Sequence, residues 1–350
     1  MAPVRNAKVL FNQPLAGLPE PGKTTIYDTS NIIDLDMVPL NGGVLVKVLS
    51  ISVEPLTAGL MMGPNKPASI PFPSYQEGQP TFSFGVGKVL RSENEGFQKG
   101  DYVVSPVLEH AEYTIPTDLN FLQKIVPEPG LPPSVYIGAA GMPGQTAFYG
   151  WKEYSKAKKG ETLFVSTAAG PVGSMVLQLA KREGMKVIAS AGTDEKVKLA
   201  KSLGADVAFN YKTTSIEEVL QKEGPIDVYW DNVSGSTLDA ALGNAALHAR
   251  FIGCGFISQL VDRTGNGVNM KNLANIVMRG INVSGFLAND AFLLEHWEKE
   301  FNDTIPKLLA KGELKYIEDR TMGLEHVTVG LAEVMAGKSM GKKIVVVSEE

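Results

Sequence analysis

Residues 162–191, TLFVSTAAGPVGSMVLQLAKREGMKVIASA, decide the fold of this chain. The segment begins with the apolar run Leu163–Val165, which is typical of a buried strand. Small residues follow at 168–173, and apolar residues then recur at helical spacing, which predicts an amphipathic helix that Gly184 ends. A second apolar run at 187–189 predicts another strand. A strand, a glycine turn, a helix and a strand within about 30 residues are typical of a dinucleotide-binding βαβ unit.

The glycine turn carries the chemistry of such a unit. Gly170 would let the backbone approach a diphosphate, and Gly173 would let the helix start lie close to the strand. Pro171 and Val172 open the helix, whose first N–H groups lack partners and would face the phosphates. Ala168 stands where the G-x-G-x-x-G fingerprint has its first glycine, so an ordinary tight turn with two structural glycines is the alternative. The flanking strands and helix favour cofactor binding.

Composition narrows the class of protein. The chain has 350 residues, 44% of them hydrophobic, which suggests two domains and a sizeable core. A formal net charge of −5 without a basic block argues against nucleic-acid or anionic-membrane partners. Cys254 is the only cysteine, so no disulfide forms within the chain. The N-terminus lacks a secretory signal and no apolar stretch could span a bilayer, so we expect a cytoplasmic location.

Two domains are expected. Residues 1–130 are rich in predicted strands, with an exposed loop at 64–80, and residues 305–350 end in one more strand. Residues 131–304 alternate strands with helical stretches, which predicts a doubly wound parallel sheet and an α/β fold. A helix over Phe292–Lys311 should be kinked or broken at Pro306. The strands expected beyond the opening unit are 43–51, 84–90, 102–104, 205–210, 226–230, 250–254, 281–285 and 344–347.

The end of the second strand of the βαβ unit bears on the cofactor. An NAD site has an acid about 20 residues after the glycine turn, bonded to the ribose 2′-hydroxyl. Residues 190–193 contain no acid, and Asp194 and Glu195 come late, where they suit the dipole of the next helix. Lys196 could face a 2′-phosphate or could be a solvated helix lysine. The missing acid favours NADP.

Ligands of a doubly wound sheet bind beyond the carboxyl ends of its strands. Three glycine-bearing tails are therefore candidate segments, at 231–235, 253–258 and 285–288. A catalytic zinc needs three protein ligands, whereas the chain has one cysteine and four scattered histidines, so we expect no metal. His110 is expected to be a surface or packing histidine.

The sequence resembles the medium-chain dehydrogenase/reductase superfamily over essentially its whole length. The resemblance is closest to the zinc-free branch of leukotriene/prostaglandin reductases and alkenal double-bond reductases. It implies a Rossmann domain at 131–304, a β-rich GroES-like catalytic domain from 1–130 and 305–350, and a homodimer. The motifs that carry it are GAAGMPGQTA at 138–147, AAGPVGS at 168–174, AGTDEK at 191–196, FNYK at 209–212, DNVSG at 231–235, CGFIS at 254–258 and GKKIVVV at 341–347.

The resemblance also implies NADPH as cofactor and assigns residues to it. The diphosphate loop falls on Gly170–Gly173, and the 2′-phosphate contacts fall on Lys196 and Tyr211. Thr146 is similar to a threonine near the nicotinamide. The other contacts on the nicotinamide side are implied at Asn232, Cys254, Gly255, Ile257, Phe286, Leu287 and Ala288.

The implied reaction is hydride transfer to the β-carbon of an α,β-unsaturated aldehyde or ketone, with protonation of the α-carbon. Leu56 and Leu260 replace tyrosines that are frequent in this branch, so we expect them to line an apolar substrate pocket or to pack in the core. Candidate donors to the carbonyl oxygen are then Tyr75, backbone N–H groups near Ser258 and the cofactor ribose. A quinone reductase of the same fold and a non-catalytic NADPH-binding protein remain alternatives.

Overall fold

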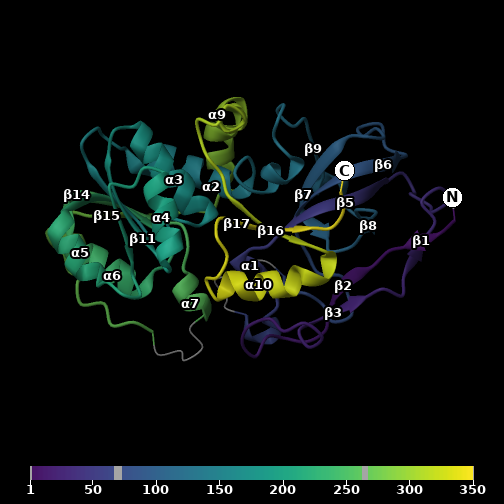
Figure 1. Cartoon of the computed structure of the whole chain (residues 1–350), viewed down its shortest axis with the longest axis horizontal. Coiled ribbons are helices and arrows are strands. Elements are labelled where there is room, and N and C mark those ends of the chain that lie inside the picture. Colours follow the sequence, from purple (N-terminus) through teal and green to yellow (C-terminus); the bar gives the residue numbers. More distant parts are fainter. Residues whose placement is uncertain (1, 67–72, 262–266, 350) are drawn as a thin grey trace. The chain divides into compact units, whose positions relative to one another are not determined.

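The computed structural model describes residues 2–66, 73–261 and 267–349, so part of the expected loop at 64–80 lies outside the described residues. The chain forms two compact units, Met1–Gly138 with Glu318–Glu350 and Ala139–Ile317. The first unit carries the β-rich part of the chain and the second carries the βαβ pattern (Figure 1).

A six-stranded parallel sheet forms the centre of the second unit. Its order is β12-β11-β10-β13-β14-β15, which counts as 3-2-1-4-5-6 along the chain and is the dinucleotide-binding order. The predicted doubly wound sheet is therefore confirmed. The strands are β10 (Thr162–Val165), β11 (Lys186–Ala191), β12 (Val207–Asn210), β13 (Ile226–Asp231), β14 (Ala245–Gly253) and β15 (Asn282–Gly285).

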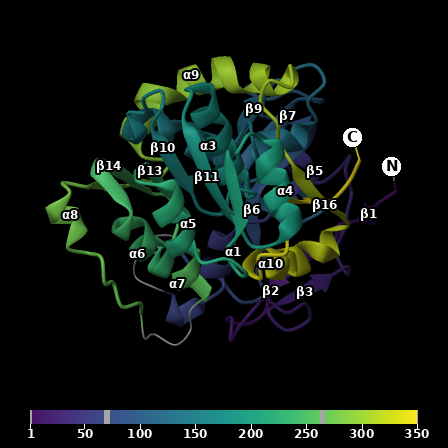
Figure 2. The same ribbon diagram turned by 60° about the vertical axis from the view of Figure 1, so that its left-hand side comes forward.

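Helices pack against this sheet and against each other. Helices α3 and α4 contact β10, β11 and β12, whereas α5 and α6 lie side by side next to β13 (Figure 2). The helices of this unit are α2 (Met142–Gly150), which continues into a π-helical turn at Trp151–Ser155, α3 (Pro171–Arg182), α4 (Asp194–Ser202), α5 (Ile216–Glu223), α6 (Gly235–Gly243), α7 (Ile257–Val261), α8 (Asn275–Met278) and α9 (Ala291–Ala310).

Helix α3 follows its predicted course. Pro171 occupies its first position, where a missing N–H costs nothing, and the buried face includes Met175 and Val176. Lys181 and Arg182 complement the dipole in the last turn, and Gly184 takes the left-handed φ of +77° that ends the helix.

Of the kink or break expected at Pro306, the break is absent, because helix α9 runs through this residue. Proline removes the hydrogen bond to the carbonyl four residues earlier, which here belongs to the exposed residue Asn302. Water can therefore solvate that carbonyl. The buried side chains of Phe301, Ile305 and Leu309 hold both sides of the proline in one continuous helix.

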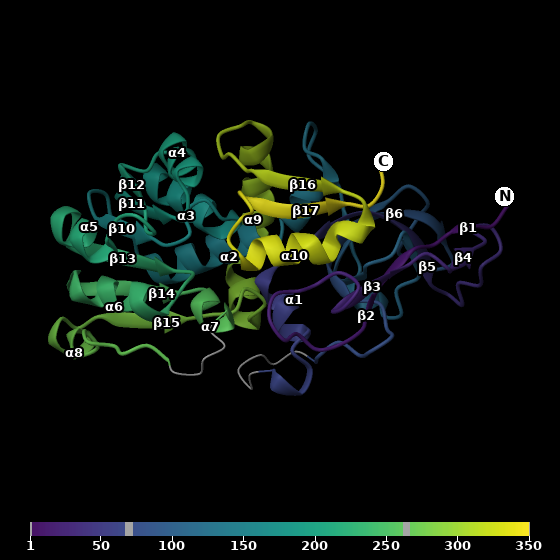
Figure 3. The ribbon, with the colours of Figure 1, turned by 60° about the horizontal axis from the view of Figure 1, so that its bottom comes forward.

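The first unit is built on a seven-stranded sheet of order β16-β17-β5-β6-β7-β9, with β8 paired to β5. Helix α10 (Val327–Met335) packs along β17 (Figure 3), and α1 (Pro55–Leu60) contacts α10. The sheet strands are β5 (Val44–Ser52), β6 (Phe82–Ser92), β7 (Tyr102–Glu109), β8 (Tyr113–Thr114), β9 (Gln123–Ile125), β16 (Glu318–Met322) and β17 (Lys342–Val346).

Two further pairs complete this unit, β1 (Val4–Arg5) with β4 (Ile32–Ile33) and β2 (Lys8–Phe11) with β3 (Thr25–Asp28). All residues of the central strand β5 except Lys47 are buried, so this strand forms the middle of the core. Among the helices of the described residues, none is both long and apolar enough to cross a membrane.

Candidate cofactor-binding site

The turn between β10 and α3 is closely packed. A Cβ atom built on Gly173 would lie 2.4 Å from the carbonyl oxygen of Thr167, which is a backbone atom that cannot swing away. The close approach of helix and strand predicted for Gly173 is therefore present. The N–H of Gly170 donates to the same Thr167 oxygen at 2.9 Å, and this bond closes the turn at the N-terminus of α3.

The structure also explains why Ala168 can stand at the first glycine position of the fingerprint. The residue with a left-handed backbone is Thr167, at φ +56°, and not Ala168. A positive φ in a β-branched residue is a genuine outlier, because the side chain crowds the backbone. No sequence pattern marks a threonine for this conformation, so Thr167 was not predictable.

The carboxyl end of β11 gathers the two residues assigned to the 2′-phosphate. A Cβ atom on Gly192 would lie 3.0 Å from the hydroxyl oxygen of Tyr211, so the tyrosine ring lies directly over this glycine. Tyr211 is 48% exposed, and its N–H donates to Ala191 at 3.1 Å. Lys196 lies in the first turn of α4, where its N–H donates to the Thr193 hydroxyl at 3.3 Å.

Asp194, the acid that follows the end of β11, is hydrogen-bonded to another side chain. The side chain of Asp194 accepts a hydrogen bond of 2.9 Å from the amide of Asn210, and Asp194 begins α4, where its charge suits the helix dipole. At the end of the sheet where Lys196 and Tyr211 lie, the carboxylate of Asp194 is therefore already bonded to Asn210.

Strands β10 and β13 are tied together where they end. The amide Nδ2 of Asn232 donates to the carbonyl of Ser166 at 2.6 Å, and the N–H of Asn232 donates to the Ser166 hydroxyl at 2.9 Å. The indole of Trp230 donates to the Asn232 side-chain oxygen at 3.2 Å. Asn232 is thus held at the switch point of the sheet, where doubly wound folds bind ligands.

Asp231 organises the neighbouring loop. Its carboxylate accepts hydrogen bonds from the Tyr229 hydroxyl at 2.8 Å and from the N–H groups of Val233 and Ser234 at 2.9 and 2.7 Å. Burial raises the pKa of Asp231. Its carbonyl oxygen accepts from the N–H groups of Cys254 and Gly255, both at 2.9 Å, so the tails of β13 and β14 are joined.

The tail after β14 packs tightly on Asn232. A Cβ atom on Gly255 would lie 2.9 Å from the carbonyl oxygen of Asn232. Burial, aided by the nearby charge of Asp231, raises the pKa of the Cys254 thiol to about 12. The hydroxyl and the N–H of Ser258 both donate to the carbonyl of Val233, at 2.5 and 3.2 Å. These bonds fix the start of α7, and they engage the Ser258 hydroxyl as a donor.

The remaining residues assigned to the nicotinamide side have mixed environments. The Thr146 hydroxyl donates to the carbonyl of Met142 at 2.8 Å, within α2. The Phe286 ring packs on the rings of Trp230 and Tyr154, with centroids 5.9 and 5.6 Å apart. Leu287 is 57% exposed, while Ile257 and Ala288 are half-buried.

Tyr75, assigned as a donor to substrate, is bound inside the β-rich unit. Its hydroxyl donates to the carbonyl of Phe82, and its ring packs edge-on against the Phe82 ring with a centroid distance of 4.9 Å. The residue is 6% exposed, and burial raises its pKa far above the usual range. A buried hydroxyl that already donates its proton is not available to a substrate oxygen.

The two leucines assigned to the substrate pocket differ in exposure. Leu56, on α1, is 37% exposed, and Leu260, on α7, is half-buried. His110 is fully packed, with both ring nitrogens 2.8 Å from hydroxyls of Thr81 and Ser83. Of the two expected roles, a surface or a packing histidine, the structure shows packing, and burial lowers the pKa of His110 to about 3.

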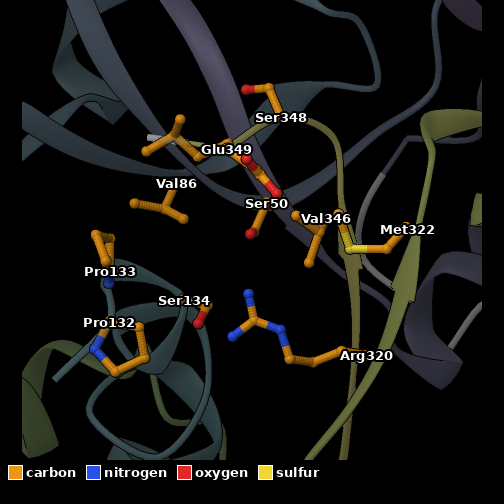
Figure 4. A pocket seen from close by; sticks show the side chains of 11 residues that line it. Ser50, Val86, Pro132, Pro133, Ser134, Arg320, Met322, Val346, Ser348 and Glu349 are labelled. Carbon is orange, nitrogen blue, oxygen red and sulfur yellow. The ribbon is translucent and has the colours of Figure 1, made fainter.

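A cavity of about 250 Å³ in the β-rich unit does not include any of the predicted site residues (Figure 4). The guanidinium of Arg320 points into it toward Ser134, and Ser50 and Met322 also line it. Across the described ranges, no three His, Cys, Asp or Glu side chains are grouped so that they could hold a metal ion.

Comparison with known proteins places this chain in a family. The zinc-binding dehydrogenase family matches residues 171–308, and the N-terminal domain of oxidoreductase family matches residues 30–125. An NADP(+)-dependent 2-alkenal reductase of Nicotiana tabacum is 38% identical over 99% of both chains. A (+)-pulegone reductase of Mentha piperita is 38% identical over 89% of both chains.

A solved structure agrees with these relatives. The crystal structure of CurA from Vibrio vulnificus in complex with NADPH has a TM-score of 0.86 and is 27% identical, over 98% of this chain and 100% of that chain. The fold, the glycine turn and the sequence relatives together show that the chain belongs to the medium-chain dehydrogenase/reductase family, in its zinc-free branch of alkenal and prostaglandin reductases.

Proposed function

We propose that this protein is an NADPH-dependent reductase of the carbon–carbon double bond in α,β-unsaturated aldehydes and ketones. The observation that carries the cofactor assignment is the end of β11, where the exposed Tyr211 lies over Gly192 and Lys196 follows in the first turn of α4. A 2′-phosphate needs a cation and a hydroxyl donor at this position, whereas a ribose 2′-hydroxyl needs an acid. The similarity to the 2-alkenal reductase and the (+)-pulegone reductase supports the activity on unsaturated carbonyl compounds.

The residues of the second unit fit this cofactor. The glycine turn at 170–173 lets the N-terminus of α3 lie close to the backbone that follows β10, so that a diphosphate can reach the first N–H groups of the helix. A side chain at Gly173 would meet the Thr167 carbonyl and push the helix away. Lys196 and Tyr211 would hold the 2′-phosphate. The residues that would hold the nicotinamide end are Thr146, Asn232, Cys254, Gly255, Ile257, Phe286, Leu287 and Ala288.

NADPH, when bound, supplies hydride to the β-carbon of the conjugated double bond. Hydrogen bonds to Ser166 and Trp230 hold Asn232 in one position, and Asn232 would in turn orient the nicotinamide end of the cofactor. Because the hydroxyls of Tyr75 and Ser258 already donate to backbone carbonyls, neither is free to stabilise charge on a substrate oxygen. The N–H groups of Cys254, Gly255 and Ser258 in the nearby tail also donate to backbone carbonyls, so the cofactor ribose is the candidate donor that this structure leaves free of such bonds.

The substrate pocket is proposed to be apolar and tolerant. Leu56 and Leu260 place aliphatic side chains where tyrosine hydroxyls are frequent in this branch, and neither leucine is fully buried. Apolar pockets discriminate weakly, by about 1–3 kcal/mol per methylene. We therefore expect medium-length or aromatic enals and enones to be preferred over small polar ones.

The test is NADPH consumption by the purified full chain with panels of enals, enones and quinones, in matched concentration series. The proposal expects turnover with conjugated carbonyl compounds and formation of the saturated product, identified by mass spectrometry. Turnover with quinones alone would assign a quinone reductase. NADPH binding without turnover of any electrophilic alkene would assign a non-catalytic NADPH-binding protein.

A homodimer is the second part of the proposal. Strand β15 ends the six-stranded sheet of the described residues, so its outer edge offers N–H and C=O groups for pairing with a second copy. Val283 in this strand is 51% exposed, and Val277 and Met278 of the preceding helix are 82% and 76% exposed. Light scattering of the wild type and of Val283→Lys tests it, because a buried lysine at this edge should yield monomers.

A further inference from the structure

Gly150 is the last residue of α2, and its backbone conformation does not require glycine. Its φ of −63° and ψ of −36° are right-handed helical values that alanine adopts more readily. Gly150 does not end the helix either, because the chain continues directly into the π-helical turn at Trp151–Ser155. Thr146 lies four residues earlier, so both residues share one face of α2. What the position requires is therefore the absence of a side chain.

The ring of Phe286 occupies the space that a side chain at Gly150 would take. A Cβ atom built on Gly150 would lie 2.4 Å from Cζ of Phe286 and 2.7 Å from its Cε1. The same Cβ would lie 2.7 Å from Cη2 of Trp230. Real Cβ atoms essentially never approach other atoms so closely, so even alanine at this position must displace one of the two rings.

The two rings differ in how firmly they are held. Trp230 is fully buried, and its indole N–H donates to the side-chain oxygen of Asn232 at 3.2 Å. Phe286 is half-buried, and its ring packs between those of Trp230 and Tyr154, with centroid distances of 5.9 and 5.6 Å. The ring of Phe286 is therefore the easier one to displace. If Trp230 moves instead, its hydrogen bond moves Asn232.

Phe286 and Asn232 lie at the ligand-binding edge of the sheet. Strands β13, β14 and β15 are parallel and in register, with Asp231 beside Gly253 and Gly253 beside Gly285. Phe286 and Asn232 are the next residues after β15 and β13, so both leave the sheet at its carboxyl edge, where doubly wound folds bind ligands. A side chain at position 150 would thus disturb this edge whichever ring moves.

We propose that Gly150 is a positioning residue for the nicotinamide end of the cofactor site. Its missing side chain seats the Phe286 ring against Trp230 and Tyr154, and the seated ring fixes the tail at 285–288. This inference rests on the proposed function, which assigns that tail to the nicotinamide. It concerns one end of the dinucleotide only, so the end that carries the adenosine 2′-phosphate should not respond to a change at Gly150.

Three variants test this seat. Gly150→Ala adds the Cβ that meets the ring, Phe286→Leu removes the ring atoms that the Cβ meets, and a double variant combines the two changes. Dissociation constants for NADPH and for 2′-phospho-ADP-ribose, which lacks the nicotinamide, are measured by calorimetry on the purified full chain, together with the melting temperature.

Gly330→Ala is the matched control. Gly330 is a buried helical glycine of α10, in the other unit of the chain. A Cβ atom built there would have as its nearest neighbour Cε of Lys343, at 3.3 Å, which belongs to a flexible side chain and can move aside. This variant should therefore keep the wild-type affinity for both ligands.

We expect Gly150→Ala to weaken NADPH by about tenfold and to bind 2′-phospho-ADP-ribose within about twofold of the wild type, because only NADPH reaches the displaced tail. Phe286→Leu should weaken NADPH by about threefold, since leucine fills the seat incompletely. The double variant should bind NADPH about as tightly as Phe286→Leu, because the space left by the ring accommodates the added Cβ. Such non-additivity is typical of residues in direct contact.

Other results would overturn the inference. Wild-type NADPH affinity in Gly150→Ala would exclude the positioning role, and equal losses for both ligands would show that Gly150 serves only the packing of α2. Losses that add in the double variant would exclude Phe286 as the seated residue. If Gly150→Ala does not fold, Phe286→Leu and the double variant decide, since both must lose NADPH affinity and keep that for 2′-phospho-ADP-ribose. A wild type that binds neither ligand would reject the proposed function, and this inference with it.

Discussion

Asn232 is fixed to Ser166 by two hydrogen bonds, from its side-chain amide to the Ser166 carbonyl at 2.6 Å and from its N–H to the Ser166 hydroxyl at 2.9 Å. These bonds join the carboxyl ends of β10 and β13, the two strands at which the order of the sheet reverses. A residue assigned to the nicotinamide end of the cofactor thus takes its position from the strand that leads into the glycine turn.

Ser166→Ala removes the hydroxyl half of this connection. Ser166 is fully buried and its hydroxyl also donates to Trp230, so the free energy of unfolding should fall by about 1–3 kcal/mol. The value of kcat/KM should fall as well, because Asn232 loses one of its anchors. Urea unfolding and steady-state kinetics measure the two effects, with the exposed Ser236→Ala as control. An unfolding energy within about 0.5 kcal/mol of the wild type would contradict the prediction.

Lys196→Ala should weaken NADPH and leave NADH nearly unchanged, because only the 2′-phosphate differs between them. A charge-assisted hydrogen bond contributes about 1.5–3 kcal/mol, or roughly 10- to 150-fold in affinity. Fluorescence titration with both cofactors measures this ratio. Lys198→Ala, at an exposed position of the same helix, should leave both affinities unchanged. Equal losses for the two cofactors would refute the assignment of Lys196.

Gly173→Val should abolish NADPH binding in a protein that remains folded. The new Cβ would lie 2.4 Å from the Thr167 carbonyl oxygen, so the start of α3 must move away from the strand. Circular dichroism checks the fold, and fluorescence titration measures the affinity. Gly17→Ala controls for the loss of a glycine, since a Cβ atom there meets nothing within 4 Å. Retained affinity would show that α3 does not hold the diphosphate.

His110 should make the protein sensitive to acid. The unfolded chain binds a proton on this imidazole near pH 6.5, whereas burial lowers the pKa in the folded state to about 3. Unfolding therefore takes up a proton between these values, and stability falls as the pH falls below about 6.5, by up to about 1.4 kcal/mol per pH unit. Urea unfolding from pH 7 to pH 4 should show a shallower slope for His110→Gln. An equal slope for the wild type and His110→Gln would contradict the prediction.

Leu260→Tyr tests the substrate pocket, because it restores a hydroxyl that is frequent in this branch. If Leu260 lines the pocket, the order of preference among enals and enones should change while NADPH affinity stays constant. Steady-state kinetics with a substrate panel measures the first, and titration measures the second. An unchanged preference with a lower melting temperature would show that Leu260 packs in the core.

The sequence predicted the doubly wound sheet because its signals are local. Buried strands such as Leu163–Val165 are short apolar runs, the face of α3 recurs at helical spacing, and Gly184 marks the end of that helix. Each signal lies within a few residues of the structure that it causes. The close packing at Gly173 was predictable for the same reason.

Long-range partners were not predictable from these patterns. We expected the Tyr75 hydroxyl to donate to substrate, but in the structure it donates to the carbonyl of Phe82. Phe82 lies in β6, whose position depends on the pairing of the whole sheet. Likewise, Pro306 has the local signal of a helix break, and burial of its neighbours keeps α9 continuous. Ser166 carries no motif, and it matters only because β13 lies beside β10.

The environment of Cys254 has a consequence for an enzyme that meets reactive alkenes. Conjugated enals alkylate thiolates rather than thiols, and burial, aided by the charge of Asp231, raises the pKa of the Cys254 thiol to about 12. Cys254 is the only cysteine of the chain. The single thiol of the protein is therefore held in its protonated form, and it should react slowly with electrophiles that alkylate thiolates.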